Sequence, residues 1–156
     1  MPLVGTILDV LLWGGLGSLL FTGLLFLLRA FGVTDAARDR EGKFRSMSVK
    51  SVVGFASVSV LMVGFPALAS VTILDDGAIS LLTAWGVAYG IFFVINLYDF
   101  VVLDYLIIVR WHPAFLNLPD TDYYKTTRPH AEGFARGTVI GIPATLVSAG
   151  LAIALT

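Results

Sequence analysis

Four long stretches of this sequence are almost continuously apolar, and they limit what the chain can fold into. A helix needs about 20 apolar residues to cross the roughly 30 Å hydrocarbon core of a bilayer, whereas a tilted transmembrane strand needs about half as many. Strands are therefore a poor interpretation of these stretches. We expect an all-α fold, a transmembrane four-helix bundle, as a single integral membrane domain over residues 1–156. The predicted spans are about 8–30, 51–74, 80–110 and 133–155.

The composition supports a membrane environment. Hydrophobic residues make up 57% of the chain and charged residues only 13%, whereas soluble domains carry about 25% charged residues. A water-soluble fold, a disordered segment and a nucleic-acid binder are excluded on this ground, and the lipid bilayer is the expected surrounding partner. The chain contains no cysteine, which excludes disulfides, iron–sulfur clusters and covalently attached haem. We expect no cofactor.

The basic residues predict the orientation. All ten flank the first and third connections between spans, whereas the second connection contains two aspartates and no basic residue. Cytoplasmic loops carry an excess of lysine and arginine. We therefore expect two cytoplasmic loops and both termini outside (N-out/C-out). The expected location is a bacterial cytoplasmic membrane, which the protein crosses several times.

Small residues recur every four positions in the fourth span, and a shorter run occurs in the third. Residues four apart share one helix face, and a face of small residues lets helices approach closely in lipid. Such a face predicts either a seam between copies of the protein or packing inside one bundle. We favour the second because several spans share the feature. The predicted packing glycines are Gly86, Gly90, Gly133, Gly137 and Gly141.

Three polar residues interrupt the third span: Asn96, Asp99 and Asp104. Trp85 and Trp111 are natural interface anchors about 39 Å apart along a helix. This register places Asp99 near the midplane, Asn96 slightly outward, and Asp104 about 7–8 Å nearer the cytoplasm. A second register, with the hydrocarbon beginning at Trp85, moves Asp104 to the interface. An unpaired carboxylate inside the membrane costs about 2.5–3.5 kcal/mol or more.

These side chains must therefore be paired, protonated or in contact with water. At about 100° per residue they share one broad helix face, which we expect to point into the bundle. For Asp104 we favour an ion pair at the inner rim, with Arg29, Lys50 and Arg136 as possible snorkelling partners. For Asp99 the interpretation stays open between a structural hydrogen-bonding centre and a site for a proton, a cation or a polar substrate.

Two histidines lie on the cytoplasmic side of this arrangement. His112 follows the third span, and His130 is predicted in the first turn of the fourth helix. A metal site built from His112, His130, Asp120 and Asp122 matches no compact ligand spacing, so hydrogen-bonded interfacial histidines are favoured and no metal site is predicted. No catalytic residue is assigned. The predicted polar binding cluster contains Asn96, Asp99, Asp104 and His130.

A paired-aspartate protease of the lipoprotein signal peptidase kind is one alternative, since that family has a similar size and four spans. Its chemistry needs two carboxylates at one scissile bond. Asp99 and Asp104 are five residues apart, which is about 140° around an α-helix. They converge only if the helix breaks between them, and a second asparagine motif of that family is missing. We therefore reject this alternative.

From position 96 to position 137 the chain resembles a group of small, functionally uncharacterised bacterial four-span integral membrane proteins. The resemblance implies an inner-membrane protein whose polar residues form one cytoplasmic-side cluster, and it implies no activity. The matching residues are Asn96, Asp99, Asp104, the Leu118-Pro119-x-Thr121-Asp122 run, Tyr124, His130 and Gly133-Phe134.

Three functions are compatible with the sequence. The first, which we place slightly ahead, is an accessory or scaffold subunit that packs against a larger membrane-protein partner through its glycine faces. The second is a small proton- or cation-linked transporter or binding protein that works as a homo-oligomer. The third is an intramembrane enzyme that uses His130 and Asp104 as acid and base near lipid headgroups.

Overall fold

The computed structural model describes residues 3–33, 48–74 and 80–156, and within them it contains helices and no strand. Four helical units are long and apolar enough to cross a membrane, which confirms the predicted all-α four-helix bundle. The elements are α1 (Leu3–Ala30), α3 (Val49–Ile73), α4 (Leu81–Tyr98) continued by the π-helix η1 (Asp99–Trp111), η2 (Ala114–Leu116), α5 (Asp122–Lys125) and α6 (Thr127–Leu155).

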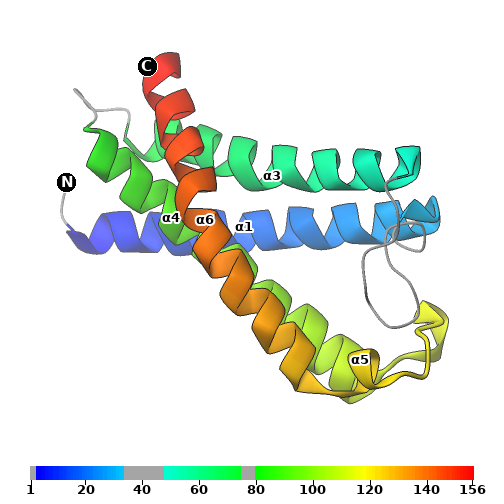
Figure 1. Cartoon of the computed structure of the whole chain (residues 1–156). Coiled ribbons are helices and arrows are strands. Elements are labelled where there is room, and N and C mark those ends of the chain that lie inside the picture. The colour runs from blue at the N-terminus through cyan, green and yellow to red at the C-terminus, as the bar shows by residue number, and fades with distance from the viewer. Residues whose placement is uncertain (1–2, 34–47, 75–79) are drawn as a thin grey trace.

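The helices form two pairs that cross obliquely (Figure 1). In one pair α1 lies beside α3, and in the other α4 with η1 lies beside α6. The pairs diverge toward the end of the bundle where α1 ends, α3 begins, η1 ends and α6 begins, which we call the loop-rich end. The main contacts of η1 are with α4, α6 and α5. Leu103 of η1 still belongs to the same hydrophobic core as Phe21 of α1, and beyond it η1 diverges from α1 and α3.

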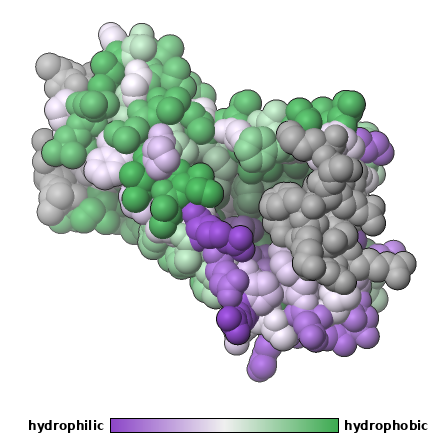
Figure 2. Space-filling view, viewed as in Figure 1, coloured by the Kyte–Doolittle hydropathy of each residue, from purple (hydrophilic) through white to green (hydrophobic). Residues whose placement is uncertain are grey.

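Helix α4 is the centre of the bundle because it contacts α1, α3 and α6. Ile91 and Ile95 of α4 are completely buried, together with the small residues Ala84 and Ala88. Around this core the outer surface of the helices is largely apolar, whereas hydrophilic residues gather at the loop-rich end (Figure 2). This distribution is expected for helices whose outer faces contact lipid.

Local hydrogen bonds mark several helix ends. Ser48 and Ser80 are the N-caps of α3 and α4, and each hydroxyl accepts a bond from a backbone N–H three residues later, at 3.1 Å in both cases. Helix α1 ends at Ala30, and Gly32 in the turn after it has a positive φ of 65° and donates its N–H to the carbonyl of Arg29 at 2.8 Å. These caps satisfy backbone groups that the helices leave unpaired.

The third span differs from the continuous α-helix that the sequence predicts. From Asp99 to Trp111 its backbone is a π-helix with hydrogen bonds between residues five apart. His112 caps its end and donates its N–H to the carbonyl of Ile107 at 2.9 Å. Several β-branched residues lie here, and such side chains crowd the preceding turn of an α-helix. In the wider π turn, Asp99 and Asp104 lie closer together around the axis than the about 140° expected for an α-helix.

Candidate functional site

The side chain of His130 is the meeting point of three elements. It projects from the first turn of α6, and only 3% of it is exposed. Its Nδ1 atom is 3.0 Å from Oδ1 of Asp104 on η1, and its Nε2 atom is 3.0 Å from the carbonyl oxygen of Tyr123 on α5. The rings of Tyr123 and His130 are also in contact, with centroids 5.1 Å apart.

Both ring nitrogens of His130 therefore face oxygen atoms. A neutral imidazole has one N–H donor, so it can donate to only one of two acceptors. Two arrangements satisfy both contacts. Either the ring is doubly protonated beside an ionised Asp104, or Asp104 is protonated and donates to Nδ1 while Nε2–H donates to Tyr123. Each arrangement holds one proton more than a neutral ring beside an ionised carboxylate.

Asp104 lies in the middle of η1, and 23% of its side chain is exposed. The sequence predicts an ion pair with one of three basic residues, whereas the contact that the structure shows for this carboxylate is with His130. Lys50 instead donates to the carbonyl of Phe31 at 3.4 Å. Asp99, one π turn earlier, is close enough for its charge to act on the His130 ring. Asp104 is therefore the carboxylate in direct contact with the buried imidazole, and Asp99 is a second negative charge in its surroundings.

Asn96 lies further along the same interface and connects α4 to α6. Its Nδ2 atom donates to Oγ1 of Thr138 at 3.0 Å and to the carbonyl of Phe134 at 3.3 Å. The side chain is buried. A Cβ atom on Gly137 would lie 2.7 Å from Oδ1 of Asn96, so this glycine makes room for the amide. Asn96 is therefore a hydrogen-bonding centre between two helices.

Replacing Asn96 with leucine is expected to lower the free energy of unfolding by about 1 kcal/mol, because interhelical hydrogen bonds in membranes contribute about 0.6–2 kcal/mol. Thr138→Val should cost less, since the carbonyl of Phe134 still accepts from the amide. Unfolding by sodium dodecyl sulfate in mixed micelles measures both. An Asn96→Leu protein as stable as the wild type would contradict this role.

The predicted packing glycines fall into two groups. A Cβ atom on Gly141 would lie 2.3 Å from the ring of Phe92, and one on Gly90 would lie 3.0 Å from Val10. The space beside Gly137 is likewise filled by the side chain of Asn96. In contrast, nothing lies within 4 Å of a Cβ atom placed on Gly86 or Gly133. Three of the five glycines therefore serve close packing inside one bundle.

Two of the other candidates for a metal site, His112 and Asp120, have local partners. His112 places Nδ1 3.1 Å from the carbonyl of Ile108 on its own helix. Lys125 forms an ion pair with the exposed Asp120, and its hydrogen bond and its charge lower the pKa of that carboxyl. Within residues 3–33, 48–74 and 80–156, no group of three or more histidine, aspartate or glutamate side chains is placed to hold a metal ion.

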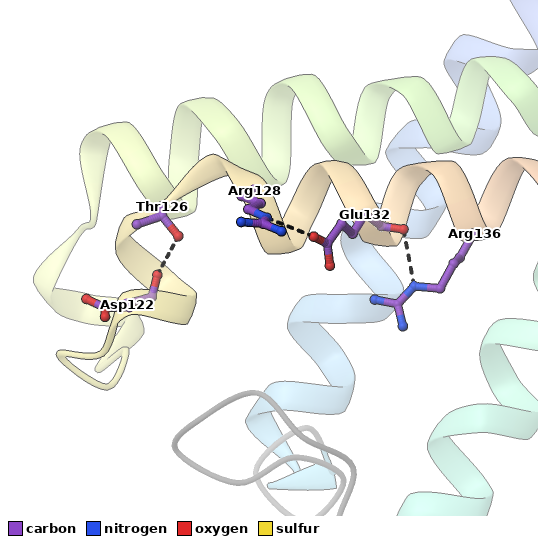
Figure 3. A network of polar contacts seen from close by, with 5 residues as sticks. All are labelled: Asp122, Thr126, Arg128, Glu132 and Arg136. Carbon is purple, nitrogen blue, oxygen red and sulfur yellow. Dashed lines mark hydrogen bonds and ion pairs between the residues drawn. The ribbon is translucent and has the colours of Figure 1, made fainter.

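Exposed polar contacts hold the start of α6 in place (Figure 3). Thr126 donates its hydroxyl to the carbonyl of Asp122 on α5 at 2.8 Å. Arg128 pairs with the carboxylate of Glu132 at 3.0 Å, and Arg136 donates to the carbonyl of Glu132 at 3.2 Å. The first of these contacts joins α5, which carries Tyr123, to the N-cap residue of α6, and the other two lie within α6 itself.

Two partners at this site were not found from the sequence. The contact at Tyr123 is a backbone carbonyl, which no side-chain motif reveals. Thr138 directly follows Gly137 in the small-residue stripe, and a hydroxyl beside such a glycine is the signal that could have pointed to it.

Compared with known proteins, the chain matches no family model, no curated protein and no solved structure. The fold itself defines the class. This is an all-α multi-pass membrane protein, with four helices long and apolar enough to cross a bilayer. Its distinguishing feature is a line of polar side chains between the α4–η1 unit and α6.

Proposed function

We propose that this protein is a small proton-linked binding or transport protein of the bacterial cytoplasmic membrane. The observation that carries the proposal is the position of His130, whose two ring nitrogens each lie 3.0 Å from an oxygen while only 3% of the side chain is exposed. Buried ionisable groups in membrane helices are costly and characteristically serve proton or ion pathways. The bound proton is the ligand, and His130 with Asp104 holds it.

The basic residues around the first and third connections support an orientation with both termini outside. The loop-rich end then faces the cytoplasm, and the proton site lies near the inner surface. Four spans leave little room for a path within one copy, so transport would require a homo-oligomer. Gly86 and Gly133 are open to such contact, since nothing lies within 4 Å of a Cβ atom placed on either residue.

The other two functions have less support. A scaffold subunit that docks through its glycine faces would need those faces on the outside. Gly90, Gly137 and Gly141 are occupied within the bundle, which leaves only Gly86 and Gly133 of the five predicted packing glycines open to a partner. An enzyme using His130 as acid or base would need access for substrate and water. The imidazole is enclosed by η1, α5 and α6, which does not favour that role.

The proton site is tested by the pH dependence of stability. The groups that face His130 are Asp99 and Asp104 from η1 and Tyr123 from α5. When the extra proton leaves, a lone pair of the imidazole faces an oxygen atom, which is unfavourable. The bound proton therefore stabilises the folded protein at low pH. This stabilisation is lost as the pH rises through the range in which the proton is released. We expect unfolding in mixed micelles, followed between about pH 5 and pH 8, to show this loss in the wild type.

The variants Asp104→Asn and His130→Gln should flatten that pH dependence. Glu132→Gln, which removes an exposed carboxylate from the same helix, should leave it intact. If all three variants keep the wild-type dependence, the pair holds no functional proton. Co-purification of a larger membrane protein with the Asp104→Asn chain would then favour the scaffold function.

A further inference from the structure

An apolar groove opens where η1 diverges from α1. It has a volume of about 140 Å³ and lies between the last turns of α1 and the second half of η1, with the loop after η1 closing one side. The divergence of the two helix pairs toward the loop-rich end is visible in Figure 1. The apolar lining includes Leu25, Phe26, Ile107, Ile108, Leu116 and Leu118.

In a bilayer this groove must be filled. An empty space deprives its lining of dispersion contacts, and water is not a suitable occupant because the lining is almost entirely apolar. A dry apolar cavity of about 150 Å³ accommodates benzene. The groove therefore has room for a segment of about six carbons from one hydrocarbon chain. A helix from another protein, with a diameter of about 10–12 Å, is too wide.

Two cationic side chains lie near the end of α1, and one of them, Arg29, borders the groove. Arg29, in the last turn of α1, is part of its lining. Lys50, near the start of α3, donates to the carbonyl of Phe31 just beyond α1, with Nζ and oxygen 3.4 Å apart. Both side chains have exposed surface. Basic pockets between membrane helices bind the head groups of anionic lipids.

We propose that an anionic phospholipid of the surrounding leaflet occupies this groove. One acyl chain lies between α1 and η1, and the phosphate contacts Arg29 and Lys50. The apolar lining recognises the chain, and the two cations select a lipid with net negative charge over a zwitterionic one. This site is separate from the proton site, because the groove is on the α1 side of η1 and His130 is on the α6 side.

The test uses the full chain reconstituted into vesicles of equal parts phosphatidylcholine and phosphatidylglycerol. The protein is extracted in mild detergent, and the lipids that remain bound are counted by mass spectrometry. The wild type should retain phosphatidylglycerol in preference to phosphatidylcholine. Arg29→Gln and Lys50→Gln should each reduce that preference by about fivefold, whereas Arg128→Gln, which removes an exposed cation elsewhere, should not change it.

A second variant tests the groove itself. Ile108 is a half-buried lining residue, and Ile108→Trp should fill the space and reduce retention of both lipids. Circular dichroism and size-exclusion profiles check that each variant is folded. Equal retention of the two lipids by the wild type, or an unchanged lipid count in a folded Ile108→Trp protein, would overturn the proposal.

Discussion

Replacing Asp104 with leucine is expected to cost the folded protein about 3 kcal/mol, whereas replacing Asp104 and His130 together with leucine should cost much less than the sum of the two single changes. Breaking a buried ion pair from one side costs about 3–5 kcal/mol, because the remaining charged or polar group stays buried without its partner. Since 23% of Asp104 is exposed, we expect a value at the lower end. Replacing both partners by apolar residues removes that cost.

The measurement is a double-mutant cycle in mixed micelles. The free energy of unfolding is determined for the wild type, the two single leucine variants and the double variant at one pH. A coupling energy of about 1–3 kcal/mol is expected for residues in direct contact. Additive effects would show that Asp104 and His130 act independently, despite the 3.0 Å between their polar atoms.

Gly141→Ala is expected to destabilise the bundle by about 1–3 kcal/mol, the usual cost of inserting a methyl group into a packed core. The new Cβ atom would lie 2.3 Å from the Phe92 ring. That ring is buried and stacked on Tyr89, with centroids 6.5 Å apart. It therefore has little freedom to move aside.

Gly133→Ala is the matched control, because it adds the same methyl group to the same helix and stripe. Nothing lies within 4 Å of that Cβ position, so the stability of this variant should stay within about 0.5 kcal/mol of the wild type. If the two variants lose equal stability, the effect comes from the helix backbone and not from the contact with Phe92.

The sequence predicts the architecture because apolar length is a local property. Each span can be recognised without knowing its neighbours, since lipid imposes the same minimum length on every helix. The four-residue spacing likewise predicts a smooth face on α6. It does not distinguish Gly141 from Gly133, because that difference depends on where the face of α6 meets α4.

The site is less accessible to prediction from sequence. Asp104 and His130 belong to different helices, and their contact depends on how η1 and α6 are packed together. The π-helix is the other obstacle, because the angular prediction assumes about 100° per residue throughout. Because η1 is a π-helix, the angle of about 140° between Asp99 and Asp104, which was the first argument against a paired-aspartate protease, does not apply. The missing asparagine motif and the pairing of Asp104 with His130 still argue against that enzyme.

The bond between His130 and the main chain of Tyr123 has a consequence for evolutionary change. A carbonyl is present whatever residue occupies position 123, so substitutions there preserve the acceptor even when they remove the aromatic ring. An insertion or deletion between Trp111 and Thr127 would shift that carbonyl along the chain and away from the imidazole. Proteins that share this site should therefore tolerate substitution at position 123 while keeping the length of this connection.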